Sequence, residues 1–202
     1  MGRDLLSLVR ADVGLSLLMT FTVMASGFIL IPNISAYLLG NLAYPRSHLG
    51  LLYGAGGFVS FFAMRIVGRL VDRFGSAAVG SFGSLAIAAI VYVGFVECPP
   101  LVPIMAVFVG FMLGSSFRNV AYNTLTTRVP RAEERARFSS IQSAVQHLAS
   151  ALGAFASSLI LVELPDKTLA GIPTVAWASI GIGLLLPPLL WTVEGRVRAA
   201  TT

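Results

Sequence analysis

Residues 13–39 read VGLSLLMTFTVMASGFILIPNISAYLL and contain no charged side chain. A helix needs about 20 apolar residues to cross a hydrocarbon core about 30 Å thick, so this run is long enough to span a bilayer. The run is also too long to be the apolar core of a cleaved secretory signal. It therefore predicts a transmembrane helix that the mature chain keeps.

Five more apolar runs follow along the chain, separated by short connections that hold proline, glycine or charged residues. Lipid offers no hydrogen bonds to unpaired backbone groups, and the strands of a barrel would be shorter and alternating, so we expect helices. The sequence predicts an all-α membrane protein with one bundle of six transmembrane helices over residues 13–193. The expected spans are Val13–Leu39, Leu49–Val67, Ala77–Val96, Leu101–Thr127, Phe138–Val162 and Ile172–Val193.

The composition excludes a soluble domain. Hydrophobic residues make up 56% of the chain and charged residues 11%, with a mean hydropathy of +0.83, whereas a soluble domain carries roughly 25% charged residues. The net charge of +5 forms no basic stripe on a polar face, so we expect no nucleic-acid partner. One cysteine excludes an intrachain disulfide, and two histidines form no metal-ligand cluster, so we expect no metal and no cofactor.

The basic residues gather on one side of the expected membrane. Arg46 and Lys167 fall on the opposite side, and Arg118 falls within a span. Because loops rich in arginine and lysine stay in the cytoplasm, segment 1–12 and tail 194–202 are both expected there. The preference for arginine over lysine suggests GC-rich coding and hence a bacterial inner (plasma) membrane. The eleven residues on the basic side are Arg3, Arg10, Arg65, Arg69, Arg73, Arg128, Arg131, Arg135, Arg137, Arg196 and Arg198.

The connection between the second and third runs reads GRLVDRFG from Gly68 to Gly75. It resembles the loop G-x-L-x-D-R-x-G of the major facilitator superfamily, which lies between the second and third helices of a six-helix half. The two glycines permit a sharp turn with closely spaced backbones. Asp72 and Arg73 are the charged pair of this motif, and Asp72 is suited to pair with arginines and to face a helix N-terminus.

The connection between the fourth and fifth runs, PRAEERAR from Pro130 to Arg137, resembles the family's loop before the eleventh helix. The stretch Phe138–Ser150 and Arg118 resemble the C-terminal half of efflux permeases of the arabinose-efflux and drug–proton antiporter type. The resemblance implies a six-helix half, helices seven to twelve, that holds a solute at the midplane between two halves. It also implies a partner, either an N-terminal six-helix half or a second copy.

Arg118 is the most informative polar residue within a span. It lies nine residues before Thr127, roughly 13 Å along a helix, where an arginine costs about 2.5–3.5 kcal/mol on insertion scales. One interpretation is that Arg118 faces the bundle interior or a water-filled cavity, where it binds an anionic group of the solute or pairs with a carboxylate. The other is that its side chain reaches back to the headgroups. Asn119 and Asn123 continue the polar surface.

Further polar residues are candidates for the solute path. Gln142 and Gln146 share a helix face with His147 beside them, and they either line the path or bond to neighbouring helices. Asn33 and Tyr37 lie near the outer end of the first span, where Pro32 favours a bend. Every carboxylate, Glu194 included, is expected at an edge or in a connection, so a coupling proton would need His147 or a carboxylate in the partner.

The leading hypothesis is transport of a small solute by alternating access, in the direction of efflux. Asp72 and its motif would then stabilise one of the two states. The alternative is a non-transporting six-helix scaffold or degenerate transporter fragment. An intramembrane enzyme is a further alternative, but Ser81 and Ser84 do not form the nucleophile elbow of a serine hydrolase, so we expect no catalytic residues.

Overall fold

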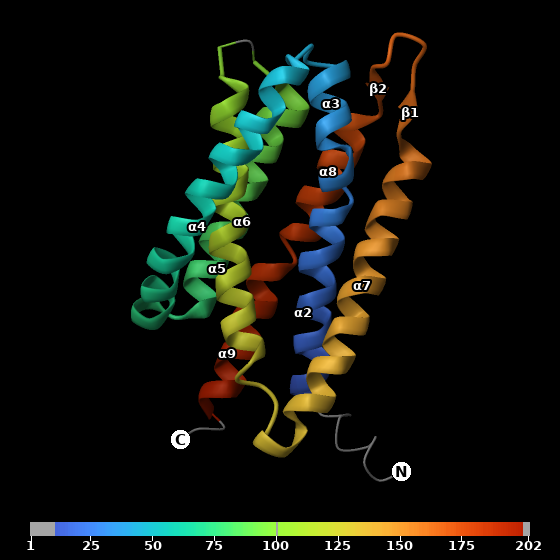
Figure 1. Cartoon of the computed structure of the whole chain (residues 1–202). Coiled ribbons are helices and arrows are strands. Elements are labelled where there is room, and N and C mark those ends of the chain that lie inside the picture. The colour runs from blue at the N-terminus through green and yellow to red at the C-terminus, as the bar shows by residue number, and fades with distance from the viewer. Residues whose placement is uncertain (1–10, 100, 200–202) are drawn as a thin grey trace.

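The computed structural model describes residues 11–99 and 101–199, and it contains six helical units long and apolar enough to cross a membrane (Figure 1). These units confirm the expected all-α, six-span architecture. Parts of the terminal segments, residues 1–10 with Arg3 and Arg10 and residues 200–202, lie outside the described residues.

Several spans consist of more than one helix. The six units, in chain order, are α2 (Ala11–Phe28) with η1 (Ile31–Asn33) and α3 (Ile34–Gly40), η2 (Arg46–His48) with α4 (Leu49–Phe74), α5 (Ser76–Val91) with the π-helix η3 (Tyr92–Glu97), α6 (Ile104–Thr126), η4 (Ala132–Glu134) with α7 (Arg135–Ile160), and α8 (Ile172–Gly183) with α9 (Leu186–Ala199). A short antiparallel hairpin of β1 (Val162–Glu163) and β2 (Leu169–Ala170) joins α7 to α8.

The helices form two groups that the last span connects. Helix α6 packs along α5 and α4, whereas α2 packs along α7, and α9 contacts both α5 and α2. Figure 1 shows α4 and α7 at opposite sides of the bundle, with the start of α2 and the end of α9 at one end and the hairpin at the other. Many large apolar side chains, Phe58, Phe61 and Leu159 among them, are exposed on the outside of the bundle, as lipid-facing positions would be.

Two spans break near the middle of the bundle, and proline explains both breaks. Helix α2 ends at Phe28, shortly before Pro32, so the helix is interrupted where the sequence predicted a bend. Helix α8 ends at Gly183, because Pro187 and Pro188 cannot donate the hydrogen bonds that would continue it. The sequence analysis did not single out this second break.

The expected loop Gly68–Ser76 is mostly helical. Helix α4 continues to Phe74, and the chain turns at Gly75 alone, where φ is 89°. A positive φ of this kind favours glycine, so Gly75 has the role that the motif predicts. The prediction for Gly68 was wrong, because Gly68 lies within α4 and a Cβ there would meet open space.

Glycines bring α5 and α6 into direct backbone contact. A Cβ added at Gly83 would lie 2.6 Å from the backbone nitrogen of Arg118 and 3.0 Å from the carbonyl oxygen of Gly114. Small residues at such contacts drive helix association in membranes, where lipid removes the hydrophobic driving force between helices. The α5–α6 contact therefore depends on the absence of a side chain at Gly83.

We expect Gly83→Val to destabilise the bundle by about 1–3 kcal/mol, the usual cost of overpacking. The measurement is the midpoint of thermal unfolding in detergent. Gly57→Val in α4 is the matched control, because a Cβ at Gly57 meets nothing within 4 Å. Equal shifts for the two variants would contradict the close contact.

Candidate functional site

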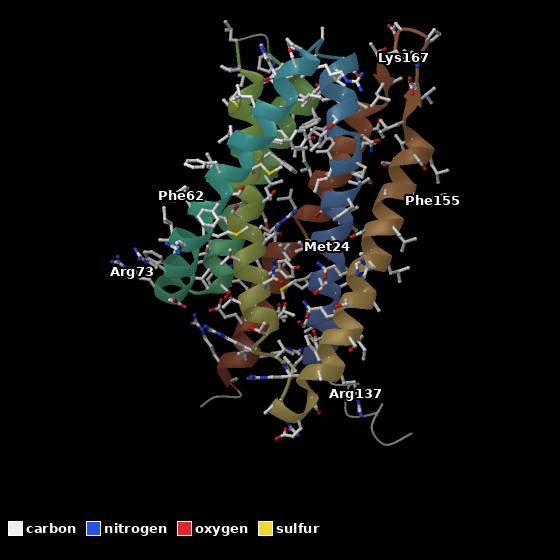
Figure 2. The ribbon with its side chains drawn as sticks, viewed as in Figure 1. Met24, Phe62, Arg73, Arg137, Phe155 and Lys167 are labelled. Carbon is white, nitrogen blue, oxygen red and sulfur yellow. The ribbon has the colours of Figure 1, made fainter. Side chains whose placement is uncertain are left out.

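Helix α7 carries two exposed faces of opposite character. At helical spacing, Leu148, Leu152, Phe155 and Leu159 form one exposed, wholly apolar face. Figure 2 shows Phe155 on the side of α7 that points away from α2. The other exposed face carries polar side chains and flanks the contact with α2. Its members are Ser139, Ser143, His147 and, partly buried, Gln146 and Ser150.

Gln146 links this polar face to α2. Its Nε2 donates a hydrogen bond of 3.6 Å to the Sδ of Met24, which is labelled in Figure 2. Gln142 lies one turn before Gln146, nearer to the N-terminal end of α7. It lines an open groove of about 420 Å³ with Arg128, Arg135 and other residues. The glutamines and His147 thus lie together, while the hydroxyl of Ser150 bonds to the backbone of α7 itself.

The two asparagines of α6 differ in their exposure. Asn123 is exposed, while Asn119 is partly buried and its Oδ1 accepts no hydrogen bond from the described residues. Helix α6 also contacts α2, so α2 lies between the polar residues of α6 and α7.

Arg118 lies apart from these polar residues, inside the bundle. Its side chain is 4% exposed, and Nη1 donates a hydrogen bond of 3.2 Å to the Oγ of Ser26 in α2. Arg118 thus faces the bundle interior, which one of the two interpretations expected, and its guanidinium bonds to a serine hydroxyl instead of a carboxylate. The physical reason is that α2, α5 and α8 surround the side chain on the inner side of α6.

Asn33 and Tyr37 lie at the outer end of the bundle and do not join the glutamines. Asn33 Nδ2 donates to Ser157 Oγ at 3.0 Å, and this bond ties the break in the first span to α7. The Tyr37 hydroxyl donates to the Gly94 carbonyl at 3.0 Å beside a small apolar cavity of about 30 Å³. In a π-helix each carbonyl accepts from the N–H five residues later, as Val93 does from Cys98. The Gly94 carbonyl stays available because the residue five positions later is Pro99, which has no N–H and follows the π-helix.

The turn between α4 and α5 has a partner that the sequence analysis missed. Glu194 of α9 lies at the edge of its span, as expected, but it is only 9% exposed, and its Oε2 accepts a hydrogen bond of 2.6 Å from the Ala77 N–H. Its Oε1 accepts a bond of 2.7 Å from Arg198. A carboxylate is favourable at the N-terminus of α5, where N–H groups lack partners within the helix. The only sequence signal for it is the Glu194–Arg198 spacing of four residues.

The charged pair of the motif stays at the surface. Asp72 and Arg73 are exposed, and among the described residues Asp72 forms no hydrogen bond or ion pair. Arg73 lies over the ring of Phe74, 5.2 Å from its centre. Asp72 thus makes no ion pair with an arginine of the described residues, and the acidic side chain at the N-terminus of α5 is Glu194. Within the parts of the chain that the structure describes, no histidine, cysteine or carboxylate cluster suits a metal ion.

The family model for the Major Facilitator Superfamily matches residues 16–201 of the chain. This match covers all six spans from Ser16 onward and confirms the resemblance at the level of the family. A comparison with curated proteins found no match, and neither did one with solved structures.

We expect Glu194→Ala to destabilise the protein by about 0.5–2 kcal/mol, as the loss of a helix cap does. Thermal unfolding in detergent measures the change. Glu163→Ala is the control, because Glu163 pairs with Lys167 at an exposed site, where ion pairs contribute little. Identical shifts in the two variants would show that Glu194 does not cap α5.

Proposed function

We propose where the solute path of this chain lies. The chain belongs to the major facilitator superfamily and is therefore a multi-pass membrane transporter of small solutes, not an enzyme. The path runs along the polar face of α7 and the adjoining parts of α2 and α6. Gln142, Gln146 and His147 are its candidate contacts, together with Asn119 and Asn123 of α6.

The contrast between the two exposed faces of α7 carries this proposal. Phe155 and Leu159 are 61% and 71% exposed, which suits lipid. His147 is exposed as well, next in sequence to the exposed Leu148 and hence at the same depth, where hydrocarbon would leave its ring nitrogens without hydrogen-bond partners. The polar face is therefore turned toward water, solute or protein.

A second set of six helices would complete the path. Of the six spans, α7 with η4 is the least buried within the bundle and α4 with η2 the next. In this superfamily the solute binds near the midplane between two six-helix halves. We propose that the chain acts as helices seven to twelve, and that an N-terminal half or a second copy supplies the other wall.

The finer assignments rest on the resemblance and the charge distribution. The resemblance to arabinose-efflux and drug–proton antiporter permeases supports efflux across a bacterial inner membrane. Both ends of the chain would lie in the cytoplasm, on the same side of the membrane as the basic residues that include Arg73 in the last turn of α4 and Arg137 in the first turn of α7. A coupling proton would use His147 or, more simply, a carboxylate of the partner.

We expect Gln146→Ala to slow transport about threefold to tenfold, because one hydrogen bond to the solute is lost. The solute is first found by screening small metabolites and drugs for stabilisation of the purified chain. Counterflow of that solute in proteoliposomes then gives the rate. Ser158→Ala is the control, since Ser158 bonds to the backbone of α7 at its outer end. Equal rates for both variants would place the path elsewhere, and no counterflow with any solute would favour the non-transporting scaffold.

The orientation is tested by labelling single cysteines in intact cells, on a Cys98→Ser background. Lys167→Cys, on the hairpin beyond the outer end of α7, is expected to react with a membrane-impermeant maleimide. Arg131→Cys, in the exposed connection before α7, is expected to react only after the cells are permeabilised. The reverse pattern would invert the proposed orientation.

A further inference from the structure

Two helices end at the same place inside the bundle. Helix α2 ends at Phe28 and α8 ends at Gly183, and both belong to spans that resume after the break. Figure 1 shows the break between α8 and α9 within the length of the bundle, not at either end. The C-terminal end of a helix carries a partial negative charge from its unpaired carbonyl groups. Two such ends therefore place negative potential in a region that lipid and protein shield from water.

The carbonyl groups at these ends lack their usual donors. In α8, Leu185 N–H bonds to Ile182 instead of Gly181, and Pro187 has no N–H to offer to Gly183. In α2, Leu30 N–H bonds to Gly27, so the Ser26 carbonyl accepts instead from the Ser179 hydroxyl at 2.7 Å.

A cation from a third helix lies between the two ends. Neither α2 nor α8 has a basic residue in its last turn. Arg118 of α6 bonds to Ser26, and a Cβ built on Gly27 would lie 3.5 Å from its Nη2, so the guanidinium covers the last turn of α2. The same side chain lines a cavity of about 10 Å³ together with Ser179 and Gly183 of α8. A cavity of that size holds about one water molecule.

The guanidinium has no carboxylate partner among the described residues, and one of its buried donors is unsatisfied. Arg118 Nε is buried and forms no hydrogen bond with the described residues. The other residues around the cavity are small or aliphatic, apart from the serines, and none is acidic. An unpaired charge in such a place is costly unless fixed dipoles stabilise it. The dipoles available here are the two helix ends and the Ser26 hydroxyl, whose oxygen accepts from Arg118.

We infer that the region between the ends of α2 and α8 is a built cation site, selective for a guanidinium group, and that Arg118 is its tethered occupant. Arg118 is then a positioning residue that fixes the two broken spans against α6 and does not touch the solute. A guanidinium fits because it is planar, weakly hydrated and rich in donors, whereas an ammonium is compact and strongly hydrated. This inference needs only the membrane fold and is independent of the solute path.

Chemical rescue tests the site directly. Arg118→Ala is purified in detergent and its thermal midpoint is measured with increasing guanidinium or methylguanidinium chloride, up to about 20 mM, far below denaturing concentrations. The variant is expected to unfold at least about 4 °C below the wild type without the ion, and guanidinium is expected to restore about half of that loss or more. Wild-type protein and Arg131→Ala, which alters an exposed arginine, are expected to shift by less than about 1 °C.

Sodium chloride and urea at the same concentrations are the controls, because sodium has the charge without the planar shape and urea has the planar shape without the charge. No recovery with guanidinium, or equal recovery with sodium, would overturn a guanidinium site. If Arg118→Ala does not fold, Arg118→Lys and Arg118→Gln decide the matter, because only the lysine keeps the positive charge. We expect the lysine variant to unfold above the glutamine variant, because it keeps the charge, but below the wild type, because an ammonium fits the site poorly. Equal midpoints for the two variants, or a lysine variant as stable as the wild type, would overturn the inference.

Discussion

The bundle depends on one constraint, which is that hydrocarbon cannot hydrogen-bond with the backbone. A straight helix satisfies its own N–H and C=O groups, but every break or end within the membrane leaves some of them without partners. In this chain, side chains from distant helices supply those partners. Tyr37 bonds to the Gly94 carbonyl, Ser179 to the Ser26 carbonyl, and Glu194 accepts the Ala77 N–H. Irregular backbone and buried polar side chains therefore occur at the same places.

These polar bonds also determine how the two helix groups meet. Within each group, close contact comes from small residues, as at Gly83 between α5 and α6 and at Gly153, where a Cβ would lie 2.9 Å from the Ala25 carbonyl of α2. Between the groups, the last span connects α5 and α2, and Ser179, Glu194 and Arg196 make polar contacts with them. Packing is non-directional, whereas these bonds are directional, so they define the relative position of the groups.

Polar residues of the same helix have different roles here because they lie on different faces of that helix. Arg118 and Asn119 are neighbours in sequence, yet the arginine side chain reaches α2 inside the bundle while the asparagine lies closer to its surface. On α7, Ser157 accepts a bond from Asn33, whereas Ser143 is exposed. A transporter needs both kinds, since the buried bonds hold each half rigid while the exposed groups offer solute contacts between the halves.

The sequence by itself determined the membrane class, the six spans, the all-helical fold and the family, because span length, hydropathy and the two connections are local properties of the chain. It also indicated Gly75 as a turn residue, since a positive φ favours glycine. Only the tertiary structure decided that Arg118 lies between α2 and α8, that Glu194 and not Asp72 meets the N-terminus of α5, and that Asn33 and Tyr37 lie apart from the glutamines. Those outcomes depend on which helices are neighbours and which way each one faces. Periodicity along one helix defines its faces but contains no information about the helix that each face will meet.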